Sequence, residues 1–343
     1  MNKVIFFVAG GTGGHLFPAI AVAKSFEKSQ SHFLVDKRTE KILLGKDFKY
    51  HVISSSKLEK NIFTIIISIF KIFYGFVYSF CLIIKFKPSL VVGFGGYTSI
   101  PTILAAKVLN KKILIHEQNS VMGKTNRFLS KISTKIAITY KNTMFANESA
   151  IFSGIPIRKL KIKNQKKKKN KKVILIIGGS QGAQVFSEII KKVLLGFDKN
   201  LLKKIFIVHQ VRKEDLKSMK NFYQNLNIKF KIKSFFTNIY DEINNSDLII
   251  SRCGASTLAE IEFFKKFCIL IPLPTSANNH QFYNAVEFKR TNNCEIINQS
   301  NINNDKLVKI IKFNLFEKKI KKIQQQRKTK KLSLVNIIND MLK

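Results

Sequence analysis

A strand-like segment followed by a glycine-rich loop occurs twice in this sequence, and each copy could bind an anion. The first is VIFFVA at residues 4–9, followed by GGTGGH; the second is VILII at residues 173–177, followed by GGSQGA. Both apolar runs have the β-branched and aromatic composition of buried parallel strands. A glycine loop that opens a helix offers backbone N–H groups and a positive dipole end to a phosphate. Two copies predict two nucleotide-binding-type domains that face each other across a cleft.

His15, at the end of the first loop, is a candidate general base. The glycines before it allow a ligand to approach the backbone closely. A histidine at a helix N-terminus is kept neutral by the helix dipole and can accept a proton. The alternative is a histidine that merely caps the turn, and the residues alone do not decide between the two.

A second candidate site is SRCGASTLAE at residues 251–260, which follows a predicted strand. In the functional interpretation, residues 255–257 bind an anion at a helix start and Glu260 accepts hydrogen bonds from a ribose diol. In the structural interpretation, Thr257 and Glu260 form a capping box, because they have its three-residue spacing. The two interpretations are not exclusive.

Two further polar clusters follow predicted strands. One joins Tyr97, after a glycine-rich stretch, with HEQN at residues 116–119 and with Asn126. Such side chains at one sheet edge suit recognition of a sugar or peptide acceptor, and ordinary loop hydrogen bonding is the alternative. The other cluster contains His280, Gln281 and Asn284. The side-chain amides of Gln281 and Asn284 are suitable partners for sugar hydroxyls.

Several common sites are absent from the sequence. There is no Asp-x-Asp pair, no HExxH and no GxxxxGK[ST] loop, which disfavours a metal-bound diphosphate and a P-loop ATPase. The four cysteines have no metal-ligand spacing and are expected to be reduced thiols of a cytosolic protein.

Alternating strands and helices must position these residues. We predict strands at residues 4–9, 32–36, 89–92, 112–115, 173–177, 204–208, 229–232, 247–250 and 267–271. This α/β order predicts parallel sheets covered by helices on both faces, with ligands beyond the carboxyl ends of the strands. The lysine-dense stretch at residues 159–172 is typical of a linker. The predicted domains are residues 1–157 and 158–325, with a C-terminal helix at 326–343 that docks back on the first.

Residues 62–84 form a long apolar segment. Its weaker residues, Thr64, Ser68, Lys71, Gly75 and Ser79, recur at helical spacing and so share one stripe. We therefore favour an amphipathic crossover helix that lays its apolar face into a membrane interface over a wholly buried helix, and both over a true span. The nearby lysines, Lys57, Lys60, Lys85 and Lys87, suit anionic headgroups.

The formal net charge is +39. Such a charge is compatible with a nucleic-acid partner or with an anionic membrane surface. It is equally compatible with compositional drift, because Lys, Ile, Asn and Phe are abundant throughout and Trp is absent. The lysines are scattered, and there is no aromatic–basic pattern of an RNA-binding domain and no zinc-ligand spacing, which disfavours nucleic acid.

Seven motifs stand in order along the chain: GGTGGH with PAIAVA, GFGGYTSIP, HEQNSVMGKTN, SGIPIR, GGSQGA, CGASTLAEI and HQFYNA. The ordered set closely resembles the MurG family, the UDP-N-acetylglucosamine–N-acetylmuramyl-(pentapeptide) pyrophosphoryl-undecaprenol N-acetylglucosamine transferases. The resemblance implies a GT-B fold, in which two Rossmann-like domains with parallel sheets face each other across a cleft. It implies inverting transfer of N-acetylglucosamine from UDP to the 4-hydroxyl of lipid-linked N-acetylmuramyl pentapeptide (lipid I, giving lipid II), at the cytoplasmic face of the bacterial inner membrane. Because the metal-binding motifs are absent, we expect no metal and no cofactor.

The resemblance also assigns residues by motif. His15 matches the family's candidate base, and Tyr97, Glu117 and Asn126 match its acceptor-side residues. Phe236 falls where the family places a smaller aliphatic residue beside the uracil. The other implied donor contacts are Thr12, Gly13, Gly14, Asn119, Arg158, Ser180, Ala255, Ser256, Thr257, Leu258, Ala259, Glu260 and Gln281.

Three rival functions remain open on the sequence. A Rossmann oxidoreductase would use the first glycine loop for pyrophosphate and Asp36 for ribose, but the loop breaks the G-x-G-x-x-G spacing. A nucleic-acid-binding protein would account for the charge. A GT-B enzyme that acts on another lipid acceptor is the closest rival.

Overall fold

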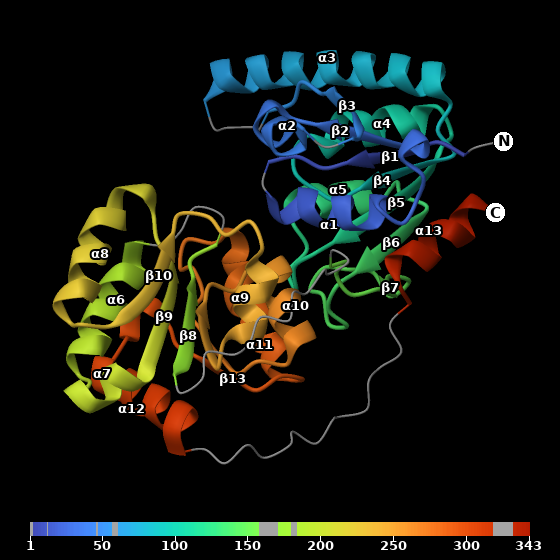
Figure 1. The fold of residues 1–343 in the computed structure, drawn as a ribbon. Coiled ribbons are helices and arrows are strands. Elements are labelled where there is room, and N and C mark those ends of the chain that lie inside the picture. The colour runs from blue at the N-terminus through green and yellow to red at the C-terminus, as the bar shows by residue number, and fades with distance from the viewer. Residues whose placement is uncertain are drawn as a thin grey trace. The chain divides into compact units, whose positions relative to one another are not determined.

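The computed structural model describes residues 3–11, 13–45, 47–56, 61–157, 171–179, 184–317 and 332–343. The chain divides into two compact units (Figure 1). The first comprises residues 1–159 and 329–343, and the second comprises residues 160–328. Each unit has a parallel sheet and its own hydrophobic core, so each can be described by itself.

The first unit is built on a seven-stranded parallel sheet with the order β3-β2-β1-β4-β5-β6-β7. Its central strands are almost wholly apolar, which is why they are buried on both faces. The strands are β1 (Ile5–Val8), β2 (Ser31–Val35), β3 (Lys49–Val52), β4 (Leu90–Gly93), β5 (Lys112–Glu117), β6 (Lys135–Ile138) and β7 (Ile151–Phe152). The order reverses between β1 and β4, so the loops after these strands meet at a topological switch point, where ligands bind in such sheets.

Helices cover both faces of this sheet. One core cluster joins one face of β1 to α1 and to α13, the C-terminal helix, and the other joins the opposite face to α3, α4 and α5. The helices are α1 (Gly13–Ala23), α2 (Lys37–Leu43), α3 (Ile62–Phe86), α4 (Ser99–Val108), α5 (Lys124–Ser130) and α13 (Leu334–Leu342), with a 3₁₀ turn at Lys28–Gln30. Leu334, Ile337, Ile338 and Met341 of α13 are all buried in the first unit's core. The chain therefore returns to its first unit after completing the second.

The second unit repeats the plan with six parallel strands in the order β10-β9-β8-β11-β12-β13. One face is covered by α6, α8 and α12, and the other by α9, α10 and α11. The strands are β8 (Lys172–Ile177), β9 (Ile205–Gln210), β10 (Lys229–Lys233), β11 (Leu248–Ser251), β12 (Cys268–Leu270) and β13 (Cys294–Ile296). The helices are α6 (Gln184–Leu195), α7 (Lys199–Lys204), α8 (Leu216–Asn225), α9 (Ile239–Asn245), α10 (Ala255–Phe264), α11 (His280–Lys289) and α12 (Asn304–Lys312). Short 3₁₀ turns lie at Lys213–Asp215, Ala277–Asn279 and Gln299–Asn301, and a π turn at Phe313–Glu317.

The nine strands predicted from apolar runs are all present, with ends shifted by one or two residues. Four other strands, β3, β6, β7 and β13, give a weak apolar signal because they are short and lie at or near sheet edges. Strand β3 reads KYHV, and none of its four side chains is fully buried. Edge strands of this kind take their place from backbone pairing rather than from an apolar pattern.

Helix α3 runs along the outer edge of the first unit (Figure 1). Its apolar face is turned away from the protein, the reverse of the usual arrangement in a soluble protein. The small and polar stripe faces the protein: Gly75 and Ser79 are buried, and the Ser79 hydroxyl lies 2.9 Å from that of Thr102 in α4. Most of the large apolar side chains point outward, with exposed fractions of 73% at Phe63 and 69% at Phe70. The wholly buried alternative is therefore wrong. By length and composition α3 could also cross a membrane, but it packs along one side against α4 of the same unit.

At Gly75, α3 lies close to the backbone of the same unit. A Cβ atom there would lie 2.0 Å from the carbonyl oxygen of Ser54, which is fixed backbone. We expect Gly75→Ala to lower stability by about 1–3 kcal/mol, although alanine favours helix, because the helix must move away. Thermal unfolding measures the change. The control Tyr74→Ala removes a neighbouring exposed side chain and should leave the melting temperature within about 1–2 °C. Equal melting temperatures for both variants would show that the contact is not tight.

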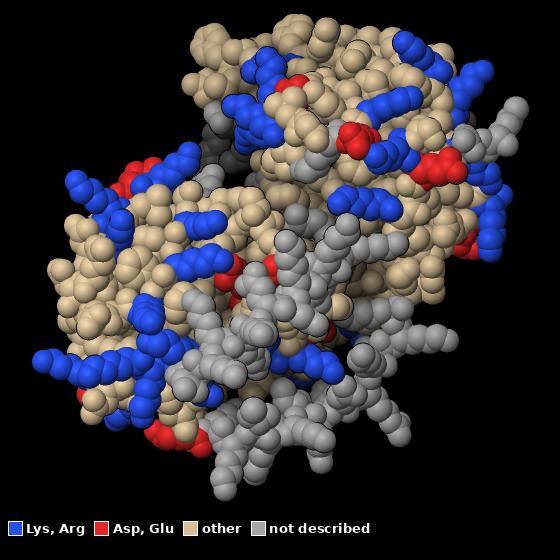
Figure 2. All heavy atoms as spheres, in the orientation of Figure 1, with Lys and Arg blue, Asp and Glu red and all other residues tan. Residues whose placement is uncertain are grey.

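Basic side chains are dispersed over the visible surface of both units and greatly outnumber acidic ones (Figure 2). No single basic stripe is visible on this face. Helix α3 itself carries only two lysines, Lys71 and Lys85, so its outer surface is predominantly apolar. Lys57 and Lys60 lie outside the described residues.

Candidate active site

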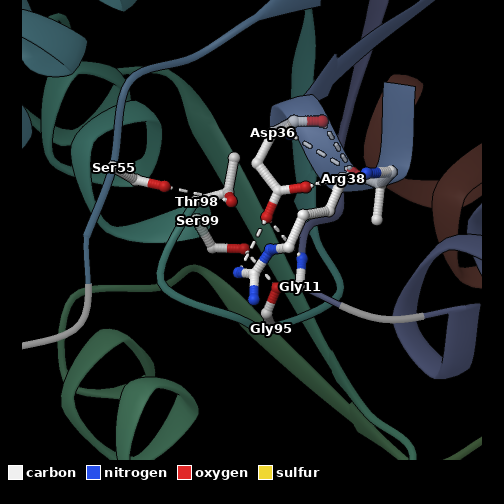
Figure 3. Close-up of polar contacts among 8 residues, drawn as sticks. Gly11, Asp36, Arg38, Ser55, Gly95, Thr98 and Ser99 are labelled. Atoms are coloured by element: carbon white, nitrogen blue, oxygen red, sulfur yellow. Dashed lines mark hydrogen bonds and ion pairs between the residues drawn. The ribbon is translucent and has the colours of Figure 1, made fainter. Parts of the chain in front are cut away.

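The first glycine loop is held in place by Asp36, which follows β2 (Figure 3). One carboxylate oxygen accepts a hydrogen bond from the Gly11 N–H at 2.8 Å, and the other accepts from the backbone and hydroxyl of Thr39. Burial by itself raises the pKa of Asp36, but the hydrogen bonds from Thr39 and Gly11 and the nearby Arg38 bring it below its ordinary value. Asp36 thus caps α2 and fixes the loop as a carboxylate, so its oxygens already have partners and it does not offer a free ribose site.

His15 lies in the first turn of α1 and contacts the loop after β5. Its Nδ1 atom is 2.8 Å from Oε1 of Gln118. The amide nitrogen of Gln118 lies 2.9 Å from the carbonyl oxygen of His116 and 3.0 Å from Nδ1 of its ring, and Nε2 of His116 lies 3.0 Å from the carbonyl oxygen of Gly154. His15 is half-buried, whereas Gln118 and His116 are fully buried. The imidazole of His15 is therefore held from behind by a buried chain of hydrogen bonds and does not merely cap the turn.

Asn126 and Glu117 form a second buried group beside this chain. Both oxygens of Glu117 accept hydrogen bonds within its own loop, from Asn119 and Gly123 backbone N–H groups and from the Asn126 side chain at 2.8 Å. The Asn126 amide nitrogen thus faces an acceptor, and its Oδ1 atom is buried with no hydrogen-bond partner among the described residues. Glu117 orients the loop and the Asn126 amide, and the open acceptor at Asn126 suits a ligand hydroxyl.

The loop after β4 brings the backbone against these groups. Gly95 and Gly96 have φ angles of 94° and 81°, which favour glycine. A Cβ on Gly95 would lie 3.3 Å from His15 Cε1 and 3.4 Å from Asn126 Oδ1, so both groups converge on this glycine. Tyr97 follows in the same loop with 37% of its surface exposed. The structure therefore brings three expected residues together, since His15 and Asn126 meet at Gly95 and Glu117 bonds to Asn126, and it places Tyr97 two residues further along the same loop.

The second unit presents an open helix start after β11. Helix α10 begins at Ala255, and its N-cap residue, Gly254, provides no side-chain hydrogen bond. Thr257 therefore lies inside the first turn, and the capping-box interpretation of Thr257 and Glu260 is wrong. The hydroxyl of Ser256 is buried with no hydrogen-bond partner among the described residues. Backbone N–H groups without a capping side chain, beside an open hydroxyl, are a suitable site for a phosphate.

Two amides from α11 clamp the peptide that leads into this helix. Oε1 of Gln281 accepts hydrogen bonds from the backbone N–H groups of Cys253 (3.2 Å) and Leu273 (3.1 Å). The side-chain amide of Asn284 donates to the Cys253 carbonyl oxygen at 3.1 Å and is fully buried. The expectation that Asn284 pairs with a sugar hydroxyl is therefore wrong, because its amide donates to the backbone. The oxygen of Gln281 thus positions the loop that leads into α10.

We expect Asn284→Ala to weaken UDP binding and to lower stability by about 1–3 kcal/mol, because the buried Cys253 carbonyl loses its partner. Calorimetric titration with UDP and thermal unfolding measure the two effects. Lys289→Ala, at the exposed end of the same helix, is the control and should change neither. An unchanged UDP affinity for Asn284→Ala would show that the clamp does not position the helix start.

Arg252 directly follows β11 and belongs to the second candidate site, but no role of its own was predicted for it from the sequence. It is only 8% exposed, and its guanidinium donates to the carbonyl oxygens of Ile271 and Pro272 and to Gln299, all neutral acceptors. Burial lowers its pKa. A cavity of about 370 Å³ lies alongside, lined by Pro272, Pro274, Asn279, Phe282, Asn298, Gln299 and Ser300. The available signal was a charged residue directly after a fully buried strand.

The structure gives less direct support for the remaining residues that were expected to contact the donor. Phe236 is 6% exposed in the core under β8 and β11, so a contact with a base would run through its backbone. The same holds for Leu258, whose side chain is also in that core. Ala259 and Glu260 are half-buried on α10, and Gly13 and Gly14 open α1. Thr12, Arg158 and Ser180 lie outside the described residues.

Comparison with known proteins covers both units. Residues 5–138 match the glycosyltransferase family 28 N-terminal domain, and residues 173–341 match the glycosyltransferase family 28 C-terminal domain. A curated protein of Rickettsia bellii, named UDP-N-acetylglucosamine–N-acetylmuramyl-(pentapeptide) pyrophosphoryl-undecaprenol N-acetylglucosamine transferase, is 38% identical over 331 residues, 90% of each chain. A Wolbachia protein (strain wRi) of the same name is 34% identical over 90% of this chain and 88% of its own. The chain belongs to the MurG family of glycosyltransferases.

Solved structures agree with the family assignment. The crystal structure of Acinetobacter baumannii MurG has a TM-score of 0.73 and 26% identity, over 92% of this chain and 91% of that one. The glycosyltransferase of kitacinnamycin, at 11% identity and a TM-score of 0.70, shares the fold alone. The predicted GT-B class, two Rossmann-like α/β domains, is confirmed. MurG membership and the bonding of Asp36 together make the oxidoreductase interpretation wrong.

Proposed function

We propose that this chain transfers N-acetylglucosamine from UDP-N-acetylglucosamine to the 4-hydroxyl of undecaprenyl-pyrophosphoryl-N-acetylmuramyl pentapeptide, converting lipid I to lipid II in peptidoglycan synthesis. The observation that carries the proposal is the match, over nine-tenths of both chains, to relatives that bear the name of this activity. The first unit is the acceptor and membrane domain, and the second is the UDP-sugar domain.

The second unit holds the donor. The N–H groups at the start of α10 and the open Ser256 hydroxyl bind the diphosphate, and Glu260, in the second turn, accepts hydrogen bonds from the ribose. Arg158 and the loop at Ser180 add contacts by family resemblance. As the bond between the anomeric carbon and the diphosphate oxygen breaks, its electron pair leaves with UDP. Fixed N–H dipoles aimed at such a growing charge stabilise the transition state, typically by about 3–4 kcal/mol per donor.

The first unit supplies the base. The acceptor 4-hydroxyl oxygen attacks the anomeric carbon from the face opposite UDP, which inverts the configuration. Its proton passes to the ring of His15, and the open Oδ1 atom of Asn126 accepts a hydrogen bond from the acceptor. Tyr97 and the loop fixed by Glu117 bound the acceptor site. The reaction forms one C–O bond, breaks one and releases UDP. The imidazolium of His15 then returns its proton to solvent.

Helix α3 places the enzyme at the membrane surface. Its outer face carries Phe63, Phe70, Phe73 and Tyr74, each more than 60% exposed, with no acidic residue in the helix. An apolar helix face of this kind lies in the headgroup region, and the basic protein surface is drawn to anionic lipid. The protein is therefore peripheral to the cytoplasmic face of the inner membrane, where its lipid acceptor lies, and the net charge needs no nucleic-acid partner.

Replacing Phe70 and Phe73 together by serine should lower partition onto vesicles of anionic phospholipid by about a hundredfold or more, because each buried Phe contributes about 1.5–3 kcal/mol. Sedimentation with vesicles measures the loss, and near-ultraviolet circular dichroism shows that the fold persists. The control pair Leu195→Ser with Phe313→Ser removes two exposed apolar side chains from the second unit and should bind vesicles normally. Equal losses for both pairs would mean that α3 is not the attachment surface.

A panel of acceptors tests the proposed activity. Labelled UDP-N-acetylglucosamine is incubated with a lipid I analogue, with an undecaprenyl-linked sugar that lacks the peptide, and with a polyprenyl phosphate. We expect transfer to the lipid I analogue at least about tenfold faster than to the others, since loss of hydrogen-bonding groups costs 10-fold or more. Preferred transfer to another lipid would favour the rival GT-B enzyme. If the protein also bound an oligonucleotide, and this binding persisted at physiological salt, the result would support the nucleic-acid interpretation.

A further inference from the structure

The donors and acceptors in the hydrogen-bond chain behind His15 can be assigned in only one way, because the backbone carbonyl oxygens in the chain can only accept. The Gln118 amide lies 2.9 Å from the carbonyl oxygen of His116, which can only accept. The nitrogen of that amide must therefore face His116, and its oxygen must face His15. An amide oxygen only accepts as well, so the His15 Nδ1 atom at 2.8 Å has to carry a proton.

The same reasoning fixes the ring of His116. Its Nε2 atom faces the carbonyl oxygen of Gly154 at 3.0 Å and must donate. Its Nδ1 atom faces the second N–H of the Gln118 amide at 3.0 Å and must accept. Both interactions need a neutral ring, and burial lowers the pKa of His116 to about 4. As neutral rings, the two histidines therefore hold opposite tautomers, Nδ1–H in His15 and Nε2–H in His116.

We propose that Gln118 is a positioning residue that locks the His15 imidazole in the Nδ1–H tautomer, so that its unprotonated Nε2 atom is presented to the acceptor hydroxyl. This inference rests on the proposed function, in which His15 is the base. The lock is preformed, since Gln118 is 2% exposed and His116 is fully buried. A neutral imidazole protonated at Nε2 could not take the acceptor proton at that atom, and the wrong tautomer is known to disable a catalytic histidine.

The adjacent carboxylate cannot take over this role. Both oxygens of Glu117 already accept hydrogen bonds, from Asn119, Gly123 and Asn126. The partner of His15 is therefore a neutral amide. An amide fixes the tautomer without placing a negative charge beside the ring, as a carboxylate would.

The spectroscopic test uses the wild-type protein labelled with ¹⁵N at histidine. Long-range ¹H–¹⁵N correlation spectra distinguish a protonated from an unprotonated ring nitrogen, and His15→Ala and His116→Gln assign the two rings by loss of signals. We expect an unprotonated Nε2 in His15 and an unprotonated Nδ1 in His116 at pH 7.5. A His15 ring protonated at Nε2 would overturn the proposal, whatever the activity of any variant.

Two substitutions complete the test. Gln118→Met keeps the length of the side chain and removes both hydrogen bonds, whereas Gln118→Glu keeps the acceptor that faces His15. We expect Gln118→Met to lose the Nδ1–H signature and at least about tenfold in kcat, with the KM for UDP-N-acetylglucosamine within about twofold. Gln118→Glu should retain the tautomer and part of the turnover. The control Gln224→Met, at an exposed position on α8, should match the wild type.

The outcomes separate this inference from the proposed function. Wild-type kcat and an unchanged His15 tautomer in Gln118→Met would overturn the lock. If instead the tautomers are as expected but His15→Ala keeps its turnover, the lock exists and His15 is not the base. That second result contradicts the proposed mechanism and leaves the assignment of the hydrogen-bond chain intact.

Discussion

Replacing His15 by alanine is expected to lower kcat by about 10²–10⁴-fold, the usual contribution of a general base. Without the imidazole, no base accepts the proton of the acceptor hydroxyl while its oxygen attacks the anomeric carbon. The affinity for UDP should change little, because the contacts proposed for the diphosphate and the ribose lie in the second unit, around α10. Steady-state transfer to a lipid I analogue and calorimetry with UDP measure the two quantities.

The control for His15→Ala is Lys107→Ala, an exposed change on α4 of the same unit, which should leave both kcat and UDP affinity unaltered. A kcat for His15→Ala within a few-fold of wild type would place the base elsewhere. A large loss of UDP affinity would instead show that the first glycine loop contributes mainly to donor binding.

Glu260→Ala should weaken UDP binding by about 10- to 100-fold. Hydrogen bonds to a charged group contribute about 1.5–3 kcal/mol each, and each 1.4 kcal/mol is tenfold in affinity. Glu260 does not serve as part of a capping box, because α10 begins at Ala255 and its N-cap is Gly254. Glu260→Gln, which keeps an acceptor oxygen but not the charge, should have an intermediate affinity. Isothermal titration with UDP and with UMP measures the series.

Glu262→Ala is the matched control, since it removes the same charge from the same helix two residues further on, and thus from another face. It should bind UDP normally. If both variants lose affinity equally, the effect is a general one of charge on α10. If neither does, Glu260 has no role at the ribose.

Much of the fold follows from local patterns. The apolar runs at β1 and β8 and the glycine loops after them predicted the two Rossmann-like sheets, because buried parallel strands have a near-continuous apolar composition. The small and polar stripe of α3 predicted which face contacts the protein. Pro18 lies inside α1, so the Gly14 carbonyl oxygen receives no hydrogen bond from residue 18.

The contacts that support the site residues could not be predicted from the sequence. Gln118 reaches His15 over 103 positions, and Asn284 reaches Cys253 over 31 positions. Such pairs depend on the order of strands in the sheet and on the rotamers of buried amides, and neither leaves a periodic signal. Asn284 was misinterpreted for the same reason, since an asparagine that binds a sugar and one that binds a carbonyl look alike in sequence. The substrate was predicted from the seven ordered motifs and not from any single residue.

The most direct measurement of the central claim is the yield and anomeric configuration of the product from UDP-α-N-acetylglucosamine and a lipid I analogue, with EDTA present. The account predicts a β-linked disaccharide on the lipid, at a rate that chelation leaves unchanged, because protein N–H groups and side chains stabilise the departing UDP. An α-linked product, turnover that requires an added divalent ion, or hydrolysis of the donor without transfer would contradict it.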